Sequence, residues 1–152
     1  MRVYRISKPQ YVDSALQGQG AALAPGRWNS KGVRLAYTAS SVSLALLEIL
    51  VHVSRESVPD GLRILAYDLP DDGISVLPQD QWPAGWDKLP YSDNVRAVGD
   101  AFIAESRSLA LLVPSALARG ERNVLINPAH PRFAGIALVD DSPLALDPRL
   151  FD

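Results

Sequence analysis

The chain contains no cysteine, only two histidines and no long apolar run. The absence of cysteine excludes disulfides, thiolate metal sites and cysteine nucleophiles, and it suits a reducing cytoplasm. With only His52 and His130 available, we expect no histidine-rich metal centre. No stretch approaches the roughly 18 unbroken apolar residues of a membrane span, and the start, MRVYRISKPQ, has no apolar segment typical of a signal peptide. We therefore expect a metal-free cytoplasmic protein that does not contact membranes.

The chain also lacks an excess of charge of either sign. Its formal net charge of −2 argues against a broad electrostatic grip on nucleic acid, because that grip needs clustered cations. Its length of 152 residues and its hydrophobic content of 47% are typical of one globular domain with a real core. We expect a single domain spanning residues 1–152.

The pattern of apolar residues predicts an α+β fold. Period-two alternation and short apolar runs predict strands, and spacing of three and four residues predicts helices. The expected strands cover residues 2–6, 32–39, 62–69, 73–77, 108–114, 122–128 and 134–139, the expected helices cover 41–56 and 93–106, and 78–90 is expected to be an ordered, irregular loop. Because strictly alternating βαβ units are absent, we expect a mainly antiparallel or mixed sheet flanked by helices.

A carboxylate lies within the most apolar segment, SVSLALLEILVHVSRE at 41–56. Helical geometry puts Glu48 on one stripe with Ser41, Leu44, His52 and Arg55. The opposite side, expected to face the core, consists of Val42, Leu46, Ile49, Leu50 and Val53. Two interpretations remain open: the stripe is the solvated face of an amphipathic helix, or Glu48 is a half-dry carboxylate in a site that stabilises positive charge.

Two further candidates lie before this helix. Arg27, in APGRWNSKG, offers a planar fork that matches a phosphate or carboxylate, or it only stacks on the neighbouring Trp28. Tyr37, in LAYTASS, stacks on a flat ligand, or it is an ordinary half-buried core residue.

Another set of candidates lies in the second half of the chain. Ser115 follows Pro114 and is either a ligand-binding serine or a turn residue that binds its own backbone. Asn127 is a further candidate, whereas His130 between two prolines is interpreted as a surface loop residue. Trp82 and Trp86 are either a docking surface or buried residues of an ordered loop.

Together these segments resemble the RES domain, a bacterial family named for its arginine, glutamate and serine. The resemblance lies in GRWN with Arg27, YTASSVSLALLEILVH with Tyr37 and Glu48, VPS with Ser115, and NVLINPAHPRF with Asn127. It spans nearly the whole chain, from VYRI to the closing LALDPRLFD. Each motif is weak by itself, but their order and spacing are fairly specific.

The resemblance implies a fold similar to that of ADP-ribosyltransferases, whose split sheet binds NAD in a cleft. It implies the toxin of a type II toxin–antitoxin system, with an Xre-type helix-turn-helix antitoxin as partner and a homodimer as one possible state within the complex. NAD is then the substrate, and no metal is expected. Glu48 stabilises the ribose cation, Arg27 holds the pyrophosphate, Tyr37 packs on the nicotinamide or its ribose, Ser115 hydrogen-bonds that ribose or Glu48, and Asn127 helps to bind the dinucleotide.

The resemblance leaves the reaction open. NAD hydrolysis and phosphorolysis need the same residues as transfer of ADP-ribose to a protein, for which the loop WPAGWDKLPYSD is a candidate recognition segment. A non-catalytic partner-binding domain is an alternative of another class, and a nucleic-acid-binding module fits less well because the chain is acidic.

Overall fold

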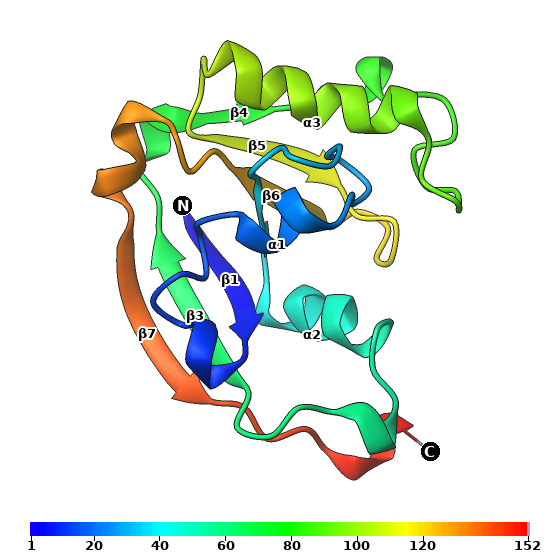
Figure 1. Ribbon diagram of the computed structural model, residues 1–152, viewed down its shortest axis with the longest axis vertical. Coiled ribbons are helices and arrows are strands. Elements are labelled where there is room, and N and C mark those ends of the chain that lie inside the picture. The colour runs from blue at the N-terminus through cyan, green and yellow to red at the C-terminus, as the bar shows by residue number, and fades with distance from the viewer. Residues whose placement is uncertain (152) are drawn as a thin grey trace.

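The computed structural model describes residues 1–151, so Asp152, the last residue of the predicted domain, lies outside the described residues. Seven strands form one sheet in the order β4-β5-β6-β2-β1-β3-β7 (Figure 1). Their bounds are β1 Arg2–Ser7, β2 Ala36–Ala39, β3 Arg63–Asp68, β4 Ile74–Val76, β5 Ala110–Pro114, β6 Arg122–Ile126 and β7 Ala137–Pro143. Only β4 and β5 pair in parallel; the other neighbours are antiparallel. The predicted α+β class with a mixed sheet is confirmed.

The three α-helices of residues 1–151 are α1 Gln19–Leu23, α2 Val42–Leu50 and α3 Asp93–Glu105. Six short 3-10 helices join them, at Pro9–Tyr11, Arg55–Ser57, Asp71–Gly73, Gln79–Gln81, Pro131–Gly135 and Pro148–Phe151. Within residues 1–151, no helix combines the length and the apolar character needed to cross a membrane.

Both long helices pack on the same face of the sheet. α3 packs on β5 and β6 through a cluster that includes Val95, Phe102 and Leu125. α2 packs on β1 and β2 through Leu44 and Ala45. Because side chains alternate along a strand, the residues between these belong to a third cluster on the opposite face. The two helices therefore cover different parts of one face, with α3 over β5 and β6 at the top of the view in Figure 1 and α2 lower down over β1 and β2.

The sheet is weakly joined between β1 and β2. These strands share a single aligned pair, Tyr4 with Ala39, whereas β1 pairs with β3 over six residues. Beyond that pair a side chain takes over the role of the missing ladder, because Arg5 Nη1 donates to the carbonyl of Tyr37 at 2.8 Å. The middle of the sheet is thus split on one side of the Tyr4–Ala39 pair.

The sequence interpretation of the α2 segment was wrong in two respects. The helix ends at Leu50 rather than near Glu56, in keeping with the β-branched valines at 51 and 53, which lower helix propensity. The buried residues are Leu44 and Ala45. Of the side expected to face the core, Leu46 and Ile49 are partly buried against the same cluster, whereas Val42 is exposed. The stripe that carries Glu48 therefore begins on the buried side of the helix and is not a uniformly solvated face.

Other predicted elements differ mainly in their bounds. The strand expected at 32–39 is confined to 36–39, because Ser30–Val33 form a turn in which Gly32 has a φ of 88°. The helix expected at 93–106 ends at Glu105, since Ser106 adopts a left-handed conformation at its C-cap. The short α1 was not predicted.

Candidate functional site

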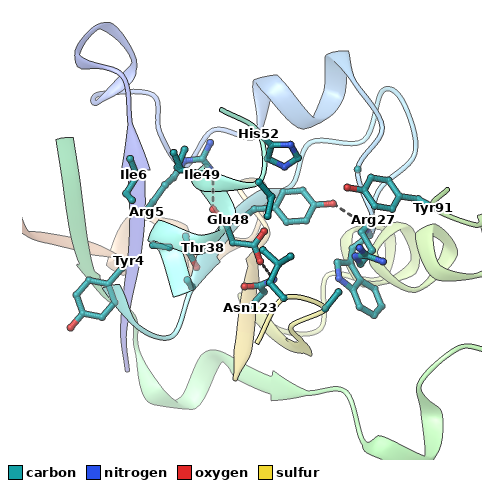
Figure 2. Close-up of a pocket in the computed structure, with 18 of the residues that line it drawn as sticks. Tyr4, Arg5, Ile6, Arg27, Thr38, Glu48, Ile49, His52, Tyr91 and Asn123 are labelled. Atoms are coloured by element: carbon teal, nitrogen blue, oxygen red, sulfur yellow. Dashed lines mark hydrogen bonds between the residues drawn. The ribbon is translucent and has the colours of Figure 1, made fainter. Parts of the chain in front are cut away.

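One cavity of about 670 Å³ opens between α2, the β1–β2 split and the loops before β2 and α3. This volume falls within the roughly 300–1,000 Å³ that is usual for small-molecule sites. Arg27, Tyr37 and Glu48, three residues chosen from sequence, all line it. Figure 2 shows Arg27 and Glu48 among its lining residues. The structure thus brings together an acid and a cation that lie 21 positions apart in the chain. Within residues 1–151, no group of three or more His, Asp or Glu side chains could hold a metal ion.

Glu48 is half-buried and points from α2 towards β6. Its Oε1 accepts a hydrogen bond of 2.8 Å from Nδ2 of Asn123 on β6 (Figure 2). The small side chains of Ala39 and Ala45, both in the cavity wall, allow the helix to approach the sheet closely enough for this contact. Among residues 1–151, Glu48 is the only carboxylate that lines the cavity. Of the two interpretations left open by the sequence, the half-dry carboxylate fits its position.

Arg27 is held by the loop that precedes α3. Its Nη1 donates to the carbonyls of Trp86 and Lys88 at 2.7 and 3.1 Å. Its guanidinium lies 4.7 Å from the centre of the Tyr91 ring, so the stacking partner is Tyr91 rather than the adjacent Trp28, which is buried in the α3 cluster. Since a guanidinium has five N–H donors, Arg27 keeps donors free for an anion in the cavity.

Tyr37 contributes its ring to the cavity wall and its hydroxyl to the Arg27 loop. The hydroxyl donates to Asn29 Oδ1 at 2.7 Å and accepts from the backbone N–H of Trp28 at 3.0 Å. Burial raises the pKa of Tyr37 above its ordinary value, so the hydroxyl stays protonated at neutral pH. It therefore anchors the loop and is not a base. The fully buried Asn29 also binds Gly26 N and Ala21 O, which fixes the whole GRWN turn.

Ser115 lies outside the cavity lining. It is 2% exposed, and its Oγ accepts from the backbone N–H groups of Leu117 and Ala118 at 3.2 and 3.1 Å. This is a serine turn of the kind weighed as the alternative in the sequence. Because Ala116 and Leu117 do line the cavity, Ser115 shapes the wall from behind.

Replacing Ser115 by alanine is expected to reduce the free energy of unfolding by about 1–2 kcal/mol, because the backbone N–H groups of Leu117 and Ala118 lose their acceptor. Urea denaturation measures this loss. Ser43→Ala, an exposed serine of α2 for which the structure shows no side-chain hydrogen bond, is the matched control and is expected to leave stability unchanged or slightly higher. Equal stability of the two variants would show that the turn does not need the hydroxyl.

Asn127 and His130 are also outside the cavity lining. The buried Asn127 donates to Ser106 Oγ and accepts from Ala129 N, which ties the end of β6 to the end of α3. His130 Nδ1 accepts from Arg132 N and caps a 3-10 helix. Both residues stabilise local loop structure, and Asn127 does not lie in the cavity with Glu48 and Arg27.

Sequence reasoning missed two polar residues of the cavity, Arg5 and Asn123. Arg5 has no carboxylate partner among residues 1–151, its Nε is buried without a hydrogen bond, and burial lowers the pKa of its guanidinium. The available signal was the place of Arg5 in RVYRI, a charged residue between Tyr4 and Ile6. Asn123 gave a weaker one, as a polar residue inside the apolar run RNVLI.

The tryptophans of the loop at 78–90 pack together. Trp82 and Trp86 meet edge to face with ring centres 5.0 Å apart, and Trp82 Nε1 donates to Leu77 O. Both pack against the α3 cluster. This arrangement favours the interpretation as partly buried residues of an ordered loop, which in turn presents the carbonyls that hold Arg27.

Within residues 1–151, the fold and the cavity together combine a split mixed sheet with a cleft that is lined by one half-buried carboxylate and two arginines. The model of the RES domain matches residues 2–147, and the chain belongs to this family. It is 38% identical over 151 residues to Toxin Res of Yersinia enterocolitica, covering 99% of both chains. It is 36% identical over 143 residues to the Prs ADP-ribosylating toxin of Sphingobium sp., covering 92% of this chain and 89% of that one.

A solved structure supports the same fold. A chain of the crystal structure of the M. tuberculosis MbcT–MbcA toxin–antitoxin complex superposes with a TM-score of 0.78 at 21% identity, covering 99% of this chain and 86% of that chain.

Proposed function

We propose that this protein is the toxin of a toxin–antitoxin system and that it consumes NAD by cleaving the bond between nicotinamide and ribose. It is an enzyme of the RES family, built as a single domain over residues 1–152. The observation that carries the proposal is that one cavity holds Glu48, Arg27 and Tyr37 together, with Arg5 as a second, unneutralised cation.

The chemistry needs little from the protein beyond placement of charge. The C1′–N bond breaks, and its electron pair neutralises the pyridinium nitrogen, so nicotinamide leaves as a neutral molecule. The ribose becomes oxocarbenium-like, as in glycoside cleavage. Glu48 stabilises this cation through its negative charge in a partly dehydrated site. A nucleophile then forms a C1′–O bond and releases a proton: water gives ADP-ribose, and inorganic phosphate gives ADP-ribose phosphate.

Two arginines match the two phosphates of NAD. Arg27 offers the N–H donors that the Trp86 and Lys88 carbonyls leave free. Arg5 uses one donor on Tyr37 O and is otherwise uncompensated in a partly enclosed position. A buried charge without a partner is costly, and a phosphate oxygen in the cavity would remove that cost.

Tyr37→Phe is expected to raise KM for NAD more than it lowers kcat. The substitution keeps the ring that forms the cavity wall but leaves Trp28 N and Asn29 Oδ1 each without one partner, so the Arg27 turn loosens. Steady-state kinetics of nicotinamide release measure the split. Tyr11→Phe, an exposed tyrosine outside the cavity, is the control. A large fall in kcat at constant KM would instead assign the hydroxyl to the chemical step.

The decisive experiment incubates purified protein with NAD, with and without phosphate, and identifies the products by mass spectrometry. Release of nicotinamide is the expected result. ADP-ribose as the product indicates hydrolysis. A product that forms only with phosphate and has the mass of ADP-ribose phosphate indicates phosphorolysis. Absence of nicotinamide from an antitoxin-free preparation under all conditions would refute the proposal.

A second candidate is transfer of ADP-ribose to a protein. It is favoured by the 36% identity to a relative that is named as an ADP-ribosylating toxin, and it uses the same cleavage step with a protein side chain as nucleophile. NAD labelled in the adenylate half distinguishes the two, because label on a protein indicates transfer whereas free labelled ADP-ribose or its phosphate indicates degradation.

An antitoxin completes the proposal. One matching structure is a toxin–antitoxin complex, and a cognate antitoxin of the Xre-type helix-turn-helix class is the partner expected here. Toxin and antitoxin would meet in the cytoplasm, where NAD is available, and a toxin homodimer within the complex is the arrangement to be tested by light scattering.

A further inference from the structure

We propose that Asn123 is a positioning residue that fixes the orientation of the Glu48 carboxylate towards the ribose. The inference rests on the proposed function for its kinetic part and on the geometry of α2 and β6 for the rest.

The first argument is the hydrogen bond itself. Asn123 Nδ2 is the one side-chain donor shown for Glu48 within residues 1–151, at 2.8 Å. A glutamate side chain has three rotatable bonds, and a single firm donor selects one arrangement among many. Without it, nothing else that the structure shows would hold the acid in the cavity.

The second argument is that the amide orientation is determined by Glu48. Asn123 Oδ1 is buried and has no hydrogen-bond partner. Turning the amide over would place this acceptor against the Glu48 carboxylate, which is worse, so the donor must face the acid. A buried unpaired acceptor costs roughly 1–3 kcal/mol. The hydrogen bond from Asn123 Nδ2 to Glu48 accounts for an asparagine at this position despite that cost.

The third argument is that Asn123 is rigid. It lies on β6 between two neighbouring strands, opposite Ala39 of β2 and Val113 of β5. Its backbone is therefore fixed by ladders on both sides, whereas Glu48 lies in the last turns of a short helix. The sheet therefore fixes the position of the Asn123 amide, and the amide in turn orients the Glu48 carboxylate.

A separate contact attaches α2 to the chain segment just before β6 and supplies a control. Glu121 Oε2 accepts from the hydroxyls of Ser40 and Ser41 at 3.2 and 3.3 Å, next to the N-terminus of α2. Glu121 is exposed and outside the cavity lining. Its replacement weakens the attachment of the helix without touching the acid, so it isolates a purely structural effect.

The test compares Asn123→Asp, Asn123→Ala and Glu121→Gln with the wild type. Asn123→Asp keeps the volume but replaces the donor by an acceptor, so the acid is repelled and not merely released. For both Asn123 variants we expect kcat for nicotinamide release to fall about 100-fold, with KM for NAD little changed because the arginines remain. Glu121→Gln should keep the kcat of the wild type. Melting temperatures identify any variant that does not fold.

A second readout does not depend on turnover. Crystal structures of the wild type and Asn123→Ala should show Glu48 in one conformer in the former, and displaced or in several conformers in the latter. A kcat for Asn123→Asp equal to that of Glu121→Gln, or an unmoved Glu48 in Asn123→Ala, would overturn the inference. Should the wild type release no nicotinamide, the proposed function falls, and the crystal structures still decide whether Asn123 positions Glu48.

Discussion

Glu48→Gln is expected to lower the rate of nicotinamide release about 100- to 1,000-fold, the loss typical when one preorganised electrostatic contact to a transition state is removed. Glutamine keeps the size of the side chain and an oxygen that can accept from Asn123. What it removes is the negative charge that we propose stabilises the ribose cation. KM for NAD should change little, because ground-state binding is assigned to the arginines. Stopped assays of nicotinamide over a range of NAD concentrations measure both parameters.

The matched control for this prediction is Glu105→Gln. Glu105 lies at the exposed end of α3, pairs with Arg107 at 3.2 Å and is outside the cavity lining. It undergoes the same loss of charge and should retain full activity. If Glu48→Gln released nicotinamide as fast as Glu105→Gln, Glu48 would have no part in the chemistry, and the cavity would need another explanation.

Gly99→Ala is expected to be the most destabilising single methyl addition in the chain. Gly99 lies on the buried side of α3, and a Cβ placed there would collide with the backbone carbonyl oxygen of Trp28. Backbone must move to admit it, so we expect a loss of about 3 kcal/mol, or roughly 6–12 °C in melting temperature for a domain of this size. Because the neighbouring Asp100 accepts from Ser30 N at 2.9 Å, the shift reaches the Arg27 turn.

Gly20→Ala is the control for this change. Gly20 lies in α1 with an ordinary helical backbone, and nothing would contact an added Cβ within 4 Å. Alanine is favoured over glycine in a helix by about 1 kcal/mol, so this variant should melt at the same temperature or higher. Differential scanning calorimetry compares the two. Equal melting of Gly99→Ala and the wild type would mean that α3 and the Arg27 turn can separate freely.

Local patterns predicted the elements well and their environments less well. The apolar and β-branched residues in RVYRI and LRILAYDL are typical of strands, and both strands formed close to where they were expected. The α2 stripe was misjudged because an apolar helix offers no contrast between its faces. Which side packs was decided by the sheet, whose small residue Ala39 accepts the helix at Ala45 and leaves Glu48 at the edge of the cavity.

The lining of the candidate site was predictable where motifs occur together in order, and not where a contact depends on tertiary structure. Arg27, Tyr37 and Glu48 stood out through their motifs and line one cavity. Ser115 and Asn127 are turn formers as often as ligands, and here their bonds are to backbone and to Ser106. The role of Asn123 could be recognised only in the folded structure, because its partner Glu48 lies 75 residues away in sequence and meets it where α2 packs near β6.

Because β1 and β2 share a single aligned pair, the sheet is weakly connected between them, and α2 packs across this junction. Leu44 and Ala45 pack α2 against the sheet, and Glu48 projects from the same helix. Detachment of α2 from the sheet would therefore separate β1 from β2 and displace Glu48 from the other residues of the cavity at the same time. Changes at Leu44 or Ala45, which attach this helix to the sheet, are therefore expected to lower stability and activity together.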